Sequence, residues 1–218
     1  GWAQKSPPGR PEVTIARDRR LASHARQWIH PHWSDLPPED VDGIVTTPER
    51  TLVDCMRNLP WDEALAIVDS ALRHDSIDKP GLRRLADATR GRGRTRIREV
   101  AAAATGAAAN PLESVLRAQA LRVPGLNVVA QLPVLTLEGL VLHPDVADES
   151  LLIAFEAEGF EWHSKSAALT RDCRRYNALS VLGWLVIRFS WALVMHHPAY
   201  VQRMLVAAAA AHQHANVA

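Results

Sequence analysis

Three carboxylates follow two apolar segments in the second half of the chain. Asp145 comes at the end of one segment, and Glu156 and Glu158 come at the end of the next. Because strand side chains alternate between faces, Glu156 and Glu158 should point the same way, and pairing of the two segments would bring all three acids to one sheet edge. Carboxylates that close repel one another, and hard oxygen ligands suit Mg²⁺ or Mn²⁺. The pattern is typical of metal-dependent phosphodiester hydrolysis.

A succession of helices and strands is expected to position these acids. Asn110 can cap a helix that begins at Pro111 and ends near Arg122. The later elements are predicted as strands over 128–135, 140–146 and 151–157, a helix over 166–182, a strand over 184–189 and a helix over about 198–211. The resulting order is αβββαβα.

The first half of the chain is predicted to be mainly helical. Short strands are expected at 12–16, 27–30 and 41–45, followed by helices from Thr46, over 61–73, and from Asp78 to 88. Thr46 and Glu49 have the spacing of a capping box. Five arginines lie within residues 90–98, where glycines indicate a hinge. We therefore predict an α+β protein with a small N-terminal domain over 1–98 and a second domain over 99–218.

The bulk composition is that of a globular protein. The 218 residues are 47% hydrophobic and 22% charged, and the net charge of +1 favours no particular class of partner. Two cysteines without a second pair are expected to be buried thiols in a reducing compartment, and no apolar segment predicts a membrane span or a secretory signal. A cytoplasmic location is expected. A chain opening on Gly1 is expected to be processed or to begin inside a longer protein.

The second half resembles a known nuclease superfamily. The matching pieces are PLES at 111–114, Pro144-Asp145, EAEGFEWH at 156–163, RDCRRYN at 171–177 and GWLVIRF at 183–189. They resemble the PD-(D/E)XK superfamily and, within it, the very-short-patch-repair-like endonucleases. The resemblance implies a restriction-endonuclease-like αβββαβα core that cleaves DNA with Mg²⁺ or Mn²⁺.

The resemblance also implies a role for each acid. Asp145 would be the central metal ligand, Glu156 the second, and Glu113 a ligand that acts directly or through water. Glu158 stands where the superfamily pattern has lysine, and His163 would act as a nearby acid or base or contact a phosphate. Each residue also has an ordinary explanation, since Glu113 and His163 can cap helices and acids at strand ends are often solvated.

The first half resembles the C-terminal part of AbiEi-type antitoxins. The matching pieces are TTPERTLVD at 46–54 and EALAIVDSALR at 63–73. Such proteins usually carry a winged helix before this region, and none is expected within residues 1–45 of this sequence. The resemblance implies DNA as a partner, together with a cognate toxin or another protein.

Two groups of arginines are candidates for phosphate contacts. The first group is Arg92, Arg94 and Arg96, and the second is Arg171, Arg174 and Arg175. Instead of binding phosphate, the first group could belong to a flexible linker and the second to a solvated helix face. Two functions remain open: a Mg²⁺-dependent DNA endonuclease, or a catalytically degenerate, DNA-binding, antitoxin-like regulator.

Overall fold

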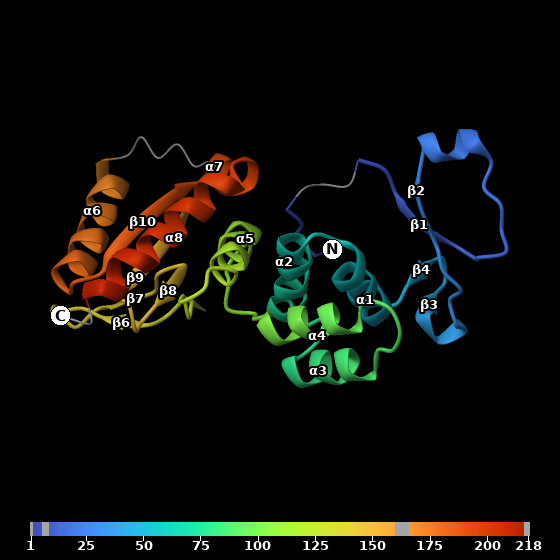
Figure 1. Ribbon diagram of the computed structural model, residues 1–218, viewed down its shortest axis with the longest axis horizontal. Coiled ribbons are helices and arrows are strands. Elements are labelled where there is room, and N and C mark those ends of the chain that lie inside the picture. The colour runs from blue at the N-terminus through green and yellow to red at the C-terminus, as the bar shows by residue number, and fades with distance from the viewer. Residues whose placement is uncertain (1, 6–8, 160–165, 216–218) are drawn as a thin grey trace.

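A computed structural model describes residues 2–5, 9–159 and 166–215, although the side chains of 166–169 and 213–215 are not described (Figure 1). Helices and strands both contribute, which confirms the predicted α+β class. Within the described ranges, no helix is long and apolar enough to cross a membrane. Cys55 is half-buried and Cys173 is exposed, so the prediction of two buried thiols was wrong for Cys173.

The N-terminal segment, residues 9–46, contains two small sheets. Strands β1 (Glu12–Ile15) and β2 (His30–Trp33) pair in parallel, and β3 (Val41–Asp42) and β4 (Val45–Thr46) form a hairpin. A 3-10 turn, η1 (Ser23–Gln27), connects β1 to β2, and a second, η2 (Pro38–Asp40), lies between β2 and β3. The single strand expected over 41–45 is divided because Gly43, with φ of +62°, makes a turn.

Four helices then pack around one apolar cluster: α1 (Pro48–Asn58), α2 (Trp61–Arg73), α3 (Lys79–Ala88) and α4 (Arg94–Ala103). The cap of α1 differs from the predicted one, because Thr47 rather than Thr46 accepts a bond from the Arg50 amide at 3.3 Å. Helix α4 begins inside the arginine-rich segment. Its residues Ile97, Val100 and Ala101 are buried against the other helices, so the predicted boundary at residue 98 falls within a packed helix.

The second half contains a four-stranded sheet in the order β10-β9-β8-β5. Its strands are β5 (Val129–Ala130), β8 (Val146–Asp148), β9 (Ile153–Glu158) and β10 (Leu185–Ser190). The β9–β10 pair is parallel and the other two pairs are antiparallel. A separate hairpin joins β6 (Val134–Leu135) to β7 (Val141–Leu142), so each of the first two predicted strands is divided in two.

Helices cover both faces of this sheet. Helices α5 (Pro111–Ala120), α7 (Trp191–His196) and α8 (Pro198–Ala215) bury one face, where Val146 and Phe155 belong to the largest apolar cluster. Helix α6 (Ser166–Val181) covers the opposite face through Leu179, and Figure 1 shows α6 and α8 on opposite sides of β10. Helix α7 was not predicted.

A buried ion pair joins the two halves. Arg117 of α5 donates to Asp69 of α2 at 2.8 Å, and the Thr105 amide donates to the same carboxylate at 2.7 Å. Arg117 also donates to the Ala103 carbonyl at 2.8 Å, at the end of α4. Removing one partner of a buried pair leaves an uncompensated charge, so this contact fixes α5 against α2.

Candidate functional site

Asp145 and Glu156 face each other on neighbouring strands. The antiparallel register pairs Val146 with Phe155, and its continuation places Asp145 opposite Glu156. The Ala157 amide donates to Asp145 Oδ2 at 2.8 Å, which holds the carboxylate against β9. Strand alternation puts both acids on the face that α6 covers, and only 3% of Glu156 is exposed.

Glu113 is a helix cap that also reaches this site. Its amide donates to Asn110 Oδ1 at 3.1 Å, and its carboxylate accepts bonds from Asn110 Nδ2 at 2.7 Å and from the Ala109 amide at 2.8 Å. The capping explanation is therefore correct. Gln131 Nε2 also donates to Glu113 Oε2 at 3.0 Å and lies 3.4 Å from Asp145 Oδ1. Gln131 thus bridges the two acids, a role that the sequence did not indicate.

Burial and mutual repulsion shift the acids toward their neutral forms. Burial raises the pKa of Glu113 and of Asp145, and repulsion between nearby carboxylates adds to each shift. Burial, followed by repulsion from Asp145, raises the pKa of Glu156 to about 8, although Arg175 opposes the shift. A bound cation would favour the charged forms of these acids and so oppose the rise in their pKa values.

Arg175 of α6 provides part of this compensation. Its Nη2 lies 3.0 Å from each carboxylate oxygen of Glu156 and donates to the His143 carbonyl at 2.8 Å. Arg175 was expected on the polar face of its helix as a DNA contact. It instead points into the site, because α6 packs this side against the sheet through Leu179, one turn later.

Glu158 has its own partners. It accepts bonds from Tyr176 Oη at 2.7 Å and from Arg188 Nε at 2.8 Å, and the Arg188 guanidinium lies 4.3 Å from the centre of the Tyr176 ring. Burial disfavours the charged form, but the Arg188 and Tyr176 bonds outweigh it and hold the pKa of Glu158 below its ordinary value. Arg188 had no assigned role in the sequence prediction.

The oxygen donors of Asp145, Glu156 and Glu113 fit a hard cation such as Mg²⁺. Burial, with a smaller contribution from mutual repulsion, raises the pKa values of all three acids, and a bound cation would oppose both effects. Within the described part of the chain, however, these acids do not bring three ligand atoms within 4.8 Å of one another. Since Arg175 contacts both oxygens of Glu156, a cation bound by this set would compete with Arg175 for that carboxylate.

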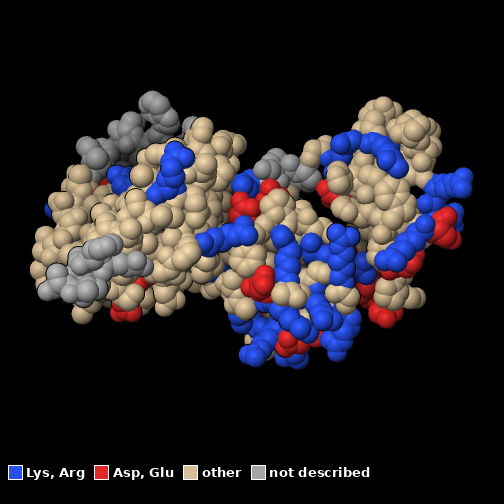
Figure 2. All heavy atoms as spheres, in the orientation of Figure 1, with Lys and Arg blue, Asp and Glu red and all other residues tan. Residues whose placement is uncertain are grey.

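The arginine candidates divide into exposed and engaged residues. Arg92 and Arg94 are exposed, as are Arg171 and Arg174 on α6. Arg96 instead donates to the carbonyls of Met56, at 2.9 Å, and Leu59, so it caps the end of α1. Figure 2 shows Lys and Arg side chains gathered over the helical half of the molecule. His163 lies outside the described residues.

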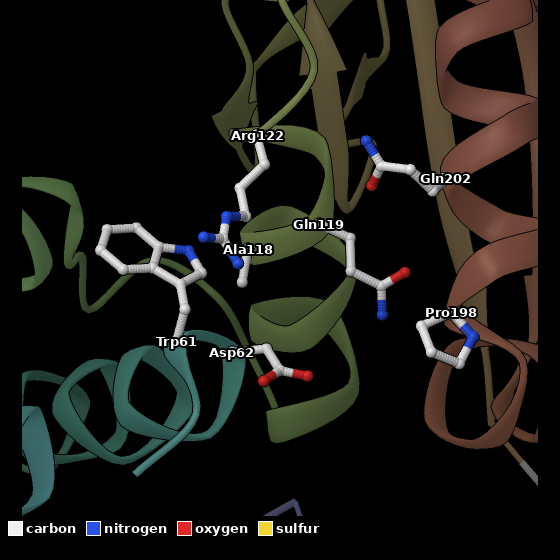
Figure 3. A pocket seen from close by; sticks show the side chains of 7 residues that line it. All are labelled: Trp61, Asp62, Ala118, Gln119, Arg122, Pro198 and Gln202. Atoms are coloured by element: carbon white, nitrogen blue, oxygen red, sulfur yellow. The ribbon is translucent and has the colours of Figure 1, made fainter. Parts of the chain in front are cut away.

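A small pocket of about 200 Å³ lies where the halves meet, away from the carboxylates. Figure 3 shows Trp61 and Asp62 from α2, Ala118 and Gln119 from α5, and Pro198 and Gln202 from α8 around it, with Arg122 above. The Arg122 guanidinium lies 5.9 Å from the Trp61 ring centre. This pocket contains none of the acids discussed above.

The known proteins that are similar to this chain have no stated activity. Neither a family model nor a solved structure matches the chain. Two uncharacterized proteins of Mycobacterium tuberculosis, one from strain CDC 1551 / Oshkosh and one from strain ATCC 25618 / H37Rv, are each 32% identical to it over 149 residues. The match covers 66% of this chain and 54% of each relative, so the chain spans about half the length of the curated relatives it matches.

Proposed function

We propose that this protein is a metal-dependent DNA endonuclease whose active site is formed by Asp145, Glu156 and Glu113. The observation that carries the proposal is the pairing of Asp145 with Glu156 on one sheet face, where burial and repulsion raise the pKa of Glu156 to about 8. Groups with strongly perturbed pKa values cluster at functional sites. If the only role of Glu156 were to pair with Arg175 for stability, a second buried carboxylate, that of Asp145, would not be needed opposite it.

The order of elements supports a restriction-endonuclease-like core. Helix α5 is followed by the segments that contain β5 to β9, then by α6, β10 and α8. This succession is similar to the expected αβββαβα order, although five short strands stand in place of three and α7 is added after β10. Asp145 directly precedes β8, the second strand of the sheet in chain order, whereas the sequence pattern placed this acid at the end of its strand; Glu156 and Glu158 lie on β9, the third strand, as expected.

In this proposal, Asp145 and Glu156 bind the cation, and Glu113 contributes directly or through water. The cation would make a bound water more acidic and offset charge on the phosphate oxygens. Gln131 and the Ala157 amide hold the Asp145 carboxylate in place. If Arg175 moved away from Glu156, its guanidinium could make bidentate contact with a phosphate.

Arg188 provides a cation close to the position of the superfamily's lysine. It lies on β10 in register with Glu156, and its Nε donates to Glu158, which replaces that lysine. A guanidinium here can stabilise charge that develops on the phosphoryl oxygens. Glu158 in turn orients Arg188, which gives this acid a positioning role.

A second function is favoured by one observation: Arg175 and Arg188 already pair with Glu156 and Glu158. If these pairs persist, the acids stabilise the fold and the protein is a DNA-binding regulator without cleavage activity, with a toxin or another protein as a further partner. Exposed Arg92, Arg94, Arg171 and Arg174 could then bind DNA through phosphate contacts alone.

A panel of DNA substrates distinguishes the two functions. The native chain is incubated with duplex, single-stranded, mismatched and branched DNA in Mg²⁺ or Mn²⁺, with EDTA as the control, while binding is measured in parallel. We expect cleavage of at least one substrate that EDTA abolishes. Binding without cleavage on every substrate would reject the endonuclease and support the regulator.

A further inference from the structure

The N-terminal segment has very little apolar core of its own. No described residue from 9 to 46 is buried, and the buried apolar residues begin at Leu52. Its β1–β2 sheet has only two strands, and an isolated two-stranded sheet is marginally stable in water. Small segments of this kind commonly need a disulfide or a metal ion to hold one structure.

A group of metal-ligating side chains lies on this sheet. Glu12 of β1 is in register with His30 of β2, and alternation places His32 on the same face as His30. The Nδ1 atom of His30 lies 3.2 Å from Glu12 Oε2, and the Nε2 atom of His32 contacts the same oxygen. Among the described residues, this is the one set of three that places its ligand atoms within 4.8 Å of one another.

We propose that Glu12, His30 and His32 bind a divalent transition metal of the zinc class. Two imidazole nitrogens and one carboxylate oxygen suit Zn²⁺, whereas Mg²⁺ prefers oxygen ligands alone. Tetrahedral zinc with bonds of about 2.0–2.1 Å separates neighbouring ligand atoms by about 3.3 Å. The separation of 3.2 Å between His30 and Glu12 is close to that spacing.

Nearby cationic side chains are engaged with other groups. Arg10 donates to the Arg26 carbonyl at 2.5 Å, and the Arg26 guanidinium lies 5.3 Å from the centre of the Trp33 ring. Arg17 forms an exposed ion pair with Asp35, 3.7 Å away. The described contacts therefore leave Glu12, His30 and His32 without a competing arginine, and these three residues would bind the metal with their own atoms.

A metal here would tie β1 to β2 across the loop between them. Binding that requires the folded arrangement contributes its free energy to folding of the segment. The proposed role is structural and independent of the endonuclease site, which lies in the other half and uses oxygen ligands. Failure of either proposal therefore leaves the other in place.

The test measures zinc stoichiometry in the full chain, prepared without a histidine tag and freed of metal by chelation. The double variant His30→Ala/His32→Ala is compared with His24→Ala/His74→Ala, which removes two exposed imidazoles elsewhere. Both carry Asp145→Asn so that zinc in the carboxylate site does not contribute. We expect the control to bind one zinc more per chain than the double variant in calorimetric titration. Equal stoichiometry would overturn the proposal.

Trypsin supplies a second, local readout. Cleavage after the exposed arginines of the β1–β2 connection, such as Arg17 and Arg19, should slow at least several-fold with zinc in the control. The same addition should leave the double variant unprotected, while far-UV circular dichroism shows that its helices remain. Zinc that protects both proteins equally, or neither, would also overturn the proposal.

Discussion

The two candidate metal sites have opposite physical character. The acids around Asp145 are largely buried, and Arg175 and Arg188 compensate part of their charge. Glu12, His30 and His32 lie near the surface and bring their ligand atoms together. At the buried site, a cation would stabilise the charged acids, but their ligand atoms do not lie close together around one position. At the exposed site, three ligand atoms lie close together, but little burial acts on the side chains.

This contrast identifies Arg175 as an internal counterion. Leaving Glu156 buried without a partner would be costly, so an arginine from α6 supplies positive charge when no metal does. A cation and Arg175 should then compete for the same carboxylate. Among the described residues, Glu12 pairs with His30 and His32 and with no arginine, so the two sites should respond differently to the removal of a neighbouring arginine.

The largest effect is expected for Arg175→Ala. The change leaves the buried carboxyl group of Glu156 without its hydrogen-bond donor, so the metal-free protein should lose about 3 kcal/mol of unfolding free energy. Because the competitor is gone, Mn²⁺ should bind the variant at least tenfold more tightly, a difference of about 1.4 kcal/mol. Thermal unfolding and calorimetric titration measure both quantities. Arg174→Ala, on the exposed side of the same helix, is the matched control, and identical behaviour of the two variants would contradict the competition.

A pH-dependent loss of unfolding free energy is expected from Glu156. Its folded pKa of about 8 lies above the ordinary value of about 4.3, so the folded protein holds a proton that the unfolded chain releases. The unfolding free energy should therefore fall as pH rises from about 5 through 8. Glu156→Gln removes the titration, so its stability relative to the native chain should increase over this interval in chemical denaturation. A constant difference between the two proteins would refute the raised pKa.

Without metal, Asp145→Asn is expected to raise the unfolding free energy by about 1 kcal/mol, a smaller effect, because the change reduces repulsion between buried acids. Added Mg²⁺ or Mn²⁺ should raise the melting temperature of the native chain and not of the variant, since only a ligand of the folded state stabilises it. Melting curves with and without metal measure this difference. Equal shifts in both proteins would place the metal elsewhere.

The smallest effect concerns DNA affinity. Arg92→Ala/Arg94→Ala should weaken binding a few-fold on all sequences and flatten its dependence on salt, because phosphate contacts release counterions. Arg96→Ala should mainly lower the melting temperature, since Arg96 binds carbonyls at the end of α1. Binding titrations at several salt concentrations test both expectations. An unchanged salt slope in the double variant would remove these arginines from the interface.

Periodicity predicted which acids share a face of the sheet better than it predicted the connections between strands. Alternation along β9 places Glu156 and Glu158 on the same face, and α2 spans the predicted residues 61–73. The break at Gln131 could not be foreseen, because its φ of +53° is rare for a residue with a side chain. That break is also what brings Gln131 to Glu113 and Asp145.

The inward direction of Arg175 was missed for a different reason. Arg171, Arg174 and Arg175 all belong to a polar stretch of α6, and local sequence does not say which turns toward the sheet. Packing of Leu179 fixes the rotation of the helix and directs Arg175 and Tyr176 to the acids. Likewise, the predicted boundary at residue 98 followed the glycines, whereas apolar packing of Ile97 and Val100 keeps α4 with the first half.

The central claim is that the buried acid pair is a metal-dependent nuclease centre. The most direct measurement is single-turnover cleavage of DNA in Mg²⁺ or Mn²⁺ by Glu156→Ala and by Glu149→Ala, which removes an exposed acid from the β8–β9 turn. We predict that Glu149→Ala cleaves at the native rate and that Glu156→Ala shows no metal-dependent cleavage, while both bind DNA within a few-fold of the native affinity. Cleavage by Glu156→Ala at the native rate would contradict the claim.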